Sequence, residues 1–213
     1  MGGGGHLPFS LPIVYCDDYW LVVNKPAGLL VHPGADKTQP HMLEYLPDDV
    51  VAASPKLVLQ HRLDKETSGV VLLTRTPEEC VRVAQLFEQH TLEKIYCCKS
   101  SAYPVHRKQQ VFSIDLALGQ RKGRVWIEAQ GQLARTEFEH LGRGWLLARP
   151  ITGRKHQIRV HLAQAGWPID GDPLYRGRAA SRLMLHAWKL KISHPDRGLI
   201  TLEAPLPSEF TLS

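Results

Sequence analysis

Residues 111–149 hold the pattern that most restricts how this chain can fold. Runs of strand-forming residues at 111–118, 124–129, 133–141 and 145–149 alternate with glycines. Short apolar runs separated by glycine-containing turns are typical of strands that fold back on their sequence neighbours. The pattern therefore predicts four consecutive antiparallel strands, with turns at Gly119, Gly123, Gly131, Gly142 and Gly144.

Further strand-type segments lie on both sides of this run. They cover residues 13–15, 19–25, 57–61, 70–74, 94–99 and 183–192. Proline and glycine punctuate them, as Lys25-Pro26-Ala27-Gly28 does after the second segment. Many strands with few helices predict one α+β domain on a mostly antiparallel, mixed sheet flanked by helices and loops.

The clearest helix signal begins at Thr76, which can cap a helix. Pro77 suits the first helical position, and the acidic residues after it suit the positive end of the helix dipole. A second helix is predicted over residues 156–165, and a single helical turn over residues 42–46. The first helix is expected to end near residue 90 and to bury Cys80, Ala84 and Phe87 on one face.

The positive charge of the chain is unevenly distributed. The formal net charge is +5, yet residues 141–191 contain ten Lys and Arg against two Asp and Glu, a local charge of +8. Such a basic segment is what a protein needs to hold nucleic-acid phosphates. A solvated basic face without a ligand would look the same, so charge alone leaves both interpretations open.

Cysteine and histidine spacing gives no support for a disulfide framework or a zinc site. Four cysteines include no C-x-x-C pair, and the eleven histidines include no H-E-x-x-H. No apolar run approaches the length of a membrane span, and the first residues do not resemble a secretory signal. We therefore expect a cytoplasmic protein with reduced thiols, no metal and no membrane partner.

Two segments concentrate chemically capable side chains. Residues 61–69 follow an apolar strand and place Asp64 between Arg62 and Lys65, whose charges favour an ionised carboxylate. Residues 150–161 gather Arg154, Lys155, His156 and Arg159 where a helix begins, which is a favourable place for phosphate. An ordinary polar turn and a solvated helix start remain the alternatives, although basic residues at a helix N-terminus oppose its dipole.

Five motifs then occur in a fixed order. They are V-N-K-P-x-G at 23–28, H-R-L-D-x-x-T-S-G at 61–69, K-x-Y at 94–96, T-G-R-x-H-Q-I-R-V-H at 152–161 and G-x-P-I-x-G-D at 166–172. In these motifs, and in L-H-A at 185–187 and H-P at 194–195, the chain resembles the RluA-type pseudouridine synthases. It departs from them at residues 97–101, where Cys97-Cys98-Lys99-Ser100-Ser101 replace an alternating small-residue strand that ends in glycine.

The resemblance implies the pseudouridine synthase catalytic fold over residues 13–213, after a flexible segment at residues 1–12. It leaves no room for the S4 RNA-binding domain that many members carry before this fold. We accordingly expect a short, catalytic-domain-only member that acts as a monomer.

The resemblance also implies an isomerase that converts specific uridines in ribosomal RNA, transfer RNA or both, without a cofactor. Asp64 would attack the base or the ribose, or remove a sugar proton. Arg159 would pair with Asp64, and Tyr96 would stack on the detached uracil and take up the carbon-5 proton.

Four further residues are expected at the RNA. Arg62 would fill the space left by the flipped base, and Arg154, Lys155 and His156 would bind the RNA. Because Arg62 lies two residues before Asp64, an extended backbone would put both side chains on one face, so Arg62 is an alternative partner for Asp64.

Two other classes of protein remain possible on the sequence. One is a catalytically inactive RNA-binding module of the same fold, against which the presence of Asp64, Tyr96 and Arg159 argues. The other is a hydrolase that uses Asp64 with a histidine such as His156, although the chain has no nucleophile elbow.

Overall fold

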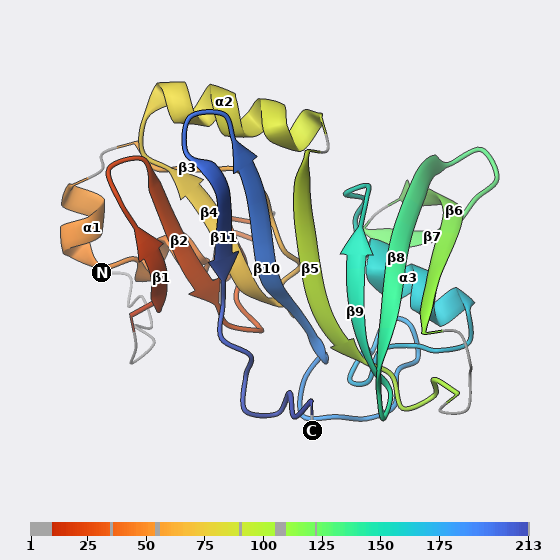
Figure 1. The fold of residues 1–213 in the computed structure, drawn as a ribbon. Helices are drawn as coiled ribbons and strands as arrows, with labels where there is room; N and C mark the ends of the chain where they lie inside the picture. The colour runs from red at the N-terminus through yellow and green to blue at the C-terminus, as the bar shows by residue number, and fades with distance from the viewer. Residues whose placement is uncertain are drawn as a thin grey trace.

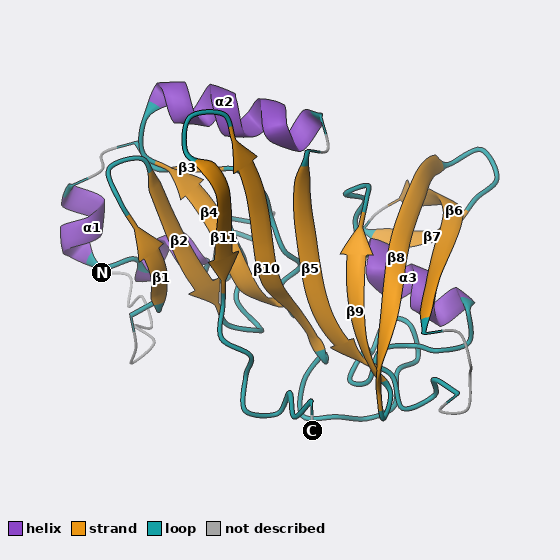
Figure 2. Cartoon of the chain, viewed as in Figure 1, coloured by secondary structure: helices purple, strands orange, loops and turns teal. Residues whose placement is uncertain are grey.

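One mixed β-sheet runs through the protein (Figures 1 and 2). The computed structural model describes residues 10–34, 36–53, 56–89, 91–104, 110–121 and 123–212, and these contain eleven strands. Nine of them follow the order β1-β2-β4-β10-β5-β9-β8-β6-β7, while β3 pairs with β4 and β11 pairs with β10. The predicted α+β fold with a mostly antiparallel sheet is confirmed.

The first part of the sheet comes from the N-terminal third of the chain. It contains β1 (Ile13–Cys16), β2 (Trp20–Lys25), β3 (Val58–Leu59) and β4 (Ser68–Thr74). Every residue of β4 is buried, since both of its faces are covered. Residues 1–9 of the expected flexible segment lie outside the described residues, and Leu11 is buried with its N–H donated to the Tyr45 carbonyl.

The second part is the run of four strands predicted from the glycine pattern. β6 (Val111–Arg121), β7 (Arg124–Ile127), β8 (Gln132–Gly142) and β9 (Trp145–Pro150) pair with one another antiparallel. β9 also pairs with β5 (Leu92–Lys99), which continues the sheet toward its centre.

Strand β10 (Leu185–His194) joins the two parts. It lies between β4 and β5, parallel to β4 and antiparallel to β5. Strand β11 (Gly198–Glu203) pairs with β10 and was not predicted from the sequence. Ala187 of β10 lies opposite Gly69 of β4. A Cβ atom at Gly69 would come within 2.1 Å of the Ala187 carbonyl oxygen, so only glycine allows this approach.

Helices cover the sheet in two places. Figure 1 shows α2 (Pro77–Glu88) across one end of the strands and α3 (Gln157–Gln164) behind the β6–β9 part. Thr76 caps α2 by accepting the Glu79 N–H, as predicted. The predicted face of α2 is only half-buried, because the helix is rotated so that Val83 is its buried apolar residue. Two short helices are η1 (Met42–Tyr45), at the predicted turn, and α1 (Asp48–Ala52), which was not predicted.

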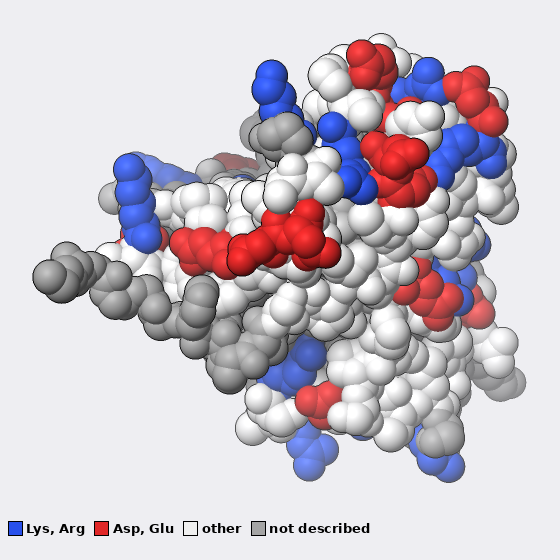
Figure 3. Space-filling view, turned by 90° about the vertical axis from the view of Figure 1, so that its left-hand side faces the viewer, with Lys and Arg blue, Asp and Glu red and all other residues white. Residues whose placement is uncertain are grey.

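The outer surface next to β1 and α1 carries charges of both signs. Figure 3 shows acidic side chains gathered in a band on this face, with basic side chains around them. Among the described residues, no helix is long and apolar enough to cross a membrane.

Candidate active site

A loop between β3 and β4 presents Asp64. Inside the loop, the Thr67 N–H donates to the Asp64 carbonyl at 3.1 Å. The loop is also held from β2, because the Lys65 carbonyl accepts the Gly28 N–H at 2.9 Å and the Lys25 ammonium at 3.0 Å. The backbone on which the Asp64 side chain stands is thus fixed on both sides.

Lys25 is a positioning group whose role the sequence did not reveal, although it stands in the first motif. Its side chain is fully buried, and its Nζ donates to the carbonyls of Pro26, Leu29 and Lys65 at 2.8, 2.8 and 3.0 Å. Burial lowers the pKa of Lys25 to about 7, although Glu66 favours its charged form. These bonds tie the end of β2 to the Asp64 loop.

The carboxylate of Asp64 faces the first turns of α3. Arg159 Nη1 donates to Asp64 Oδ2 at 3.1 Å, and the rest of the guanidinium is held by Asp172, with Nε–Oδ2 and Nη2–Oδ1 distances of 2.7 and 2.8 Å. Asp172 also accepts the N–H groups of Leu174 and Tyr175. Such a bidentate pair fixes the guanidinium plane, so Arg159 can approach Asp64 in only one orientation.

His156 is the second basic residue that faces Asp64. Its Nε2 lies 3.7 Å from Asp64 Oδ1, and its Nδ1 lies 2.8 Å from the Tyr175 hydroxyl. Burial lowers the pKa of His156, while the negative charge of Asp64 opposes that shift. The side chain is 8% exposed, so this residue, expected at the RNA, is turned into the protein.

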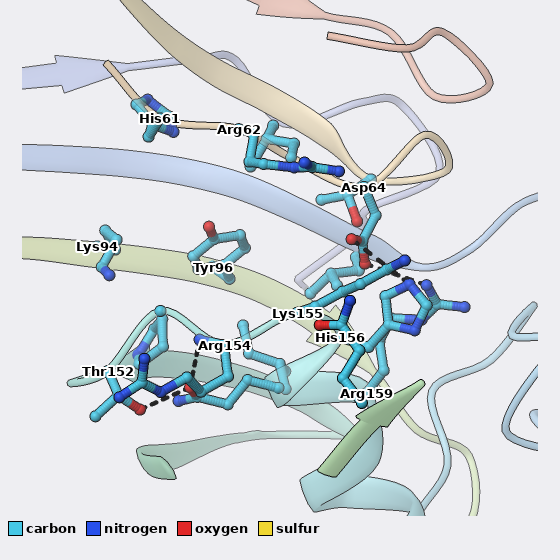
Figure 4. A pocket seen from close by; sticks show the side chains of 18 of the residues that line it. His61, Arg62, Asp64, Lys94, Tyr96, Thr152, Arg154, Lys155, His156 and Arg159 are labelled. Carbon is cyan, nitrogen blue, oxygen red and sulfur yellow. Dashed lines mark hydrogen bonds and ion pairs between the residues drawn. The ribbon is translucent and has the colours of Figure 1, made fainter. Parts of the chain in front are cut away.

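Strand β5 forms the opposite side of the site. Lys94 and Tyr96 stand two residues apart on it, so both side chains project from the same face, as Figure 4 shows. Burial and the charge of Asp64 raise the pKa of Tyr96, which keeps its hydroxyl protonated at neutral pH. Burial lowers the pKa of Lys94, a lysine that the sequence pattern marked without indicating a role.

These elements enclose a cavity of about 490 Å³. In Figure 4, Asp64 points from its loop toward His156 and Arg159, while Tyr96 lies between Asp64 and Lys94. The volume is in the range of small-molecule sites and is large enough for a nucleoside. The expected site residues that line it are Arg62, Asp64, Tyr96, Arg154, Lys155, His156 and Arg159.

The segment before α3 is organised by Gln157. Its Oε1 accepts the Thr152 hydroxyl at 2.6 Å and the Arg154 N–H at 3.0 Å, and its Nε2 donates to the Arg135 carbonyl and the Thr136 hydroxyl. The buried side-chain amide of Gln157 thus gives a structural role to three residues of the fourth motif. It holds the turn that brings Arg154 and Lys155 to the cavity.

His61, the first residue of the second motif, has a structural role. Its ring stacks on Phe87 with centroids 5.4 Å apart, and its Nε2 accepts the Leu72 N–H at 3.1 Å. Burial lowers its pKa to about 4, so the ring is neutral and can accept that bond. Motif membership alone did not separate this role from catalysis.

Arg62 and Arg159 differ in their partners. Within the described ranges, Arg62 is exposed and makes no hydrogen bond or ion pair, whereas Arg159 is buried and bonds Asp64. Of the two candidates that the sequence left open, Arg159 is the one paired with Asp64.

The structure divides the basic segment 141–191 into paired and unpaired cations. Arg149 binds Glu93 and Glu139, Lys191 binds Glu93, and Lys189 binds Glu203. Arg154 and Lys155 make no ion pair with any described residue. Fewer cations of this segment are therefore free to contact RNA phosphates than the sequence suggested.

No group of three or more His, Cys, Asp and Glu side chains that could hold a metal ion occurs within the described ranges. Among the described residues, the chemistry-bearing groups that line the cavity are one carboxylate, one phenol, two imidazoles and several cations.

Comparison with known proteins identifies similar chains. The family model described as RNA pseudouridylate synthase matches residues 19–164. Ribosomal large subunit pseudouridine synthase D of Nitrosomonas europaea is 34% identical over 93% of this chain and 63% of its own length. An uncharacterised RNA pseudouridine synthase of Zymomonas mobilis is 34% identical over 93% of this chain and 95% of its own length.

A solved structure is similar as well. Human RNA pseudouridylate synthase domain containing 4 superposes with a TM-score of 0.75 and 25% identity, over 93% of this chain and 90% of that one. The chain spans only part of some relatives: it covers 63% of the length of the Nitrosomonas protein and 60% of the length of a Neisseria meningitidis relative with the same name.

Proposed function

The chain belongs to the RNA pseudouridylate synthase family, and we propose that it isomerises selected uridines in structured RNA to pseudouridine. The observation that carries this proposal is the Asp64 carboxylate, held by Arg159 at the edge of a cavity that also contains Tyr96. The reaction detaches uracil from carbon 1 of the ribose and rejoins it through carbon 5. No atom is gained or lost overall, so the proposed mechanism needs no cofactor.

Asp64 is the proposed catalytic residue. Arg159 donates a hydrogen bond to its carboxylate at ion-pair distance, and this holds the side chain in place whether Asp64 attacks the base, attacks the ribose or removes a sugar proton. Its side chain is 22% exposed, so substrate can reach it, while Arg159 is 3% exposed and serves as a support.

Tyr96 is the proposed platform for the detached uracil. Its ring lies in the cavity next to Asp64, and the raised pKa keeps the hydroxyl neutral. A neutral phenol stacks well but cannot accept a proton directly. If Tyr96 takes up the carbon-5 proton, its own proton must first leave.

The RNA is the proposed partner, with the target base flipped out of its stack into the cavity. Arg62, exposed at the cavity, would replace the flipped base, and Arg154 and Lys155 would hold phosphates. Because the Nitrosomonas relative is named a ribosomal large subunit pseudouridine synthase, large-subunit ribosomal RNA is the first substrate to test, and transfer RNA is the second. We further propose that the protein acts in the cytoplasm as a monomer.

The experiment uses RNA labelled with tritium at carbon 5 of uridine. Joining carbon 5 to the ribose displaces that hydrogen, so the proposed reaction releases tritium into water, and the Asp64→Asn variant should release none. RNA binding without tritium release would instead identify an inactive binding module. Release of free uracil would identify a hydrolase.

A further inference from the structure

The two oxygens of Asp64 are held in different ways. Oδ2 accepts a hydrogen bond from Arg159 at 3.1 Å. Oδ1 faces His156 Nε2 at 3.7 Å, which is an ion-pair distance but too long for a hydrogen bond. Among the described residues, Oδ1 therefore keeps its lone pairs free for a substrate atom while a nitrogen stands beside it.

His156 is fixed on its far side. The Tyr175 hydroxyl lies 2.8 Å from Nδ1, the two rings meet edge to face with centroids 5.7 Å apart, and the same hydroxyl lies 3.3 Å from the Val125 carbonyl. Tyr175 in turn follows Asp172, which binds its backbone N–H and the Arg159 guanidinium. A single turn at residues 172–175 thus supports both basic side chains that face Asp64.

The hydrogen bonds limit where the proton of His156 can be. If Tyr175 donates to Nδ1, the neutral ring carries its proton on Nε2, toward Asp64. If the ring is charged, both nitrogens carry protons and Tyr175 donates to Val125. The remaining state, neutral with the proton on Nδ1, points a lone pair at the carboxylate and is repelled by it. In both favourable states an N–H faces Oδ1.

The backbone of His156 is held in an unfavourable conformation. Its φ is +53°, in the left-handed region that most side chains avoid. Asparagine adopts this region more readily than histidine. Backbone strain of this kind at the edge of a cavity motivates a hypothesis about the function of the side chain.

We propose that His156 is a positioning residue. Its ring, oriented by Tyr175, points an N–H at Asp64 Oδ1 and keeps this oxygen in the orientation in which it reacts with the substrate. The inference rests on the proposed function for the identity of the reaction, and it removes His156 from the expected RNA contacts. Arg159, Lys155 and Asp172 are the other charged groups near the imidazole.

The first test compares two variants of His156 in single-turnover reactions on RNA. His156→Asn tolerates the backbone but is too short to reach Asp64, so the maximal rate should fall about 10- to 100-fold with unchanged RNA affinity. His156→Gln can place an amide N–H near Oδ1 and should recover most of the rate. Tyr175→Phe should lower the rate less, and combining it with His156→Asn should add little further loss.

The matched control is His140→Phe, a half-buried histidine on β8 whose ring contacts Tyr103 outside the cavity. It should leave rate and affinity unchanged. If His156→Asn weakens RNA binding about tenfold while the maximal rate is kept, His156 is a phosphate contact and the proposal is wrong.

The second test does not depend on activity. The His156 ring is titrated by NMR in the wild-type protein and in Asp64→Asn, without RNA. Because the charge of Asp64 raises the pKa of His156 against the effect of burial, its removal should shift that pKa further down. An unchanged titration would show that Nε2 does not face the carboxylate, even if the protein makes pseudouridine. A shifted titration in a protein that makes no pseudouridine would leave the geometry standing and refute the proposed function.

Discussion

At Asp64, removing one charge should separate RNA binding from chemistry. Asp64→Asn keeps the shape of the side chain but cannot form the ion pair with Arg159 or act as nucleophile or base. We expect product formation to be abolished and RNA affinity to stay within a few-fold of wild type, measured by tritium release and filter binding. Turnover within tenfold of wild type would rule out the catalytic role of Asp64.

A variant of Tyr96 can distinguish a role in stacking on the base from a role in proton transfer. Tyr96→Phe keeps the ring and removes the hydroxyl, whose raised pKa already disfavours a role as a base. If the hydroxyl moves a proton, base detachment should continue while final product falls, and chromatography of quenched reactions would detect the stalled species. Unchanged product formation would leave Tyr96 as a platform only.

The two arginines near Asp64 should respond differently to RNA structure. Arg62→Ala removes a side chain without a partner among the described residues and should slow reaction mainly on folded RNA, where unstacking costs a few kcal/mol. Arg159→Ala removes the ion pair and should harm both substrates alike.

Single-turnover rates on a stem-loop and on a matched unstructured strand provide the measurement for this pair of variants. Equal losses for Arg62→Ala on both substrates would contradict its proposed role in replacing the flipped base.

At the scale of elements, the turn before α3 should control how RNA binding depends on salt. Arg154 and Lys155 lack ion-pair partners among the described residues, so either alanine variant should reduce the slope of log affinity against log salt by about 1. The control is Lys189→Ala on β10, because Lys189 is already paired with Glu203. Equal effects at all three positions would mean that the whole basic segment binds RNA.

The elements that the sequence predicted best are those with local causes. Thr76 and Pro77 define the start of α2 through capping, and four of the five predicted glycines mark the turns of the β6–β9 run. The prediction was wrong at Gly119, which lies inside β6 opposite Trp126 of β7. β11 was missed because its pairing with β10 shows only in the folded sheet. The predicted start of β10 was two residues early, since Leu183 packs in the core outside the strand.

In the candidate site, too, the sequence predicted some residues, while others became evident only in the folded structure. The three residues that the resemblance grouped, Asp64, Tyr96 and Arg159, all line one cavity, and their catalytic roles stay proposals. Asp172 stands in the fifth motif but was given no role, and Tyr175 was not singled out, because their contacts are with residues 13 and 19 positions away in the sequence. Burial, which turns His156 inward, is likewise invisible in a motif.

For the whole molecule, three histidines should make stability sensitive to mild acid. Burial lowers the pKa of His61, His161 and His186 to about 4 in the folded state, against 6.5 when exposed. Below pH 6.5 the unfolded chain binds protons that the folded protein excludes, so stability is complete above 6.5 and is lost as the pH falls toward 4. The slope approaches about 4 kcal/mol per pH unit.

Urea unfolding at pH 7.5, 6 and 5 measures this dependence. His161→Leu is a matched variant, because both ring nitrogens of His161 lack partners among the described residues. It should reduce the slope by about a third. A midpoint that stays constant between pH 7.5 and 5 would contradict the expectation.

The central place of β10 has a consequence for a chain made from its N-terminus onward. Asp64 leaves the ribosome early, followed by Tyr96 and then Arg159, but the strand that fixes β4 beside β5 comes only at residues 185–194. Until it inserts, the two walls of the cavity belong to separate pieces of sheet. A nascent chain can therefore carry all of its candidate reactive groups without assembling them, and activity should begin only when translation has passed β10.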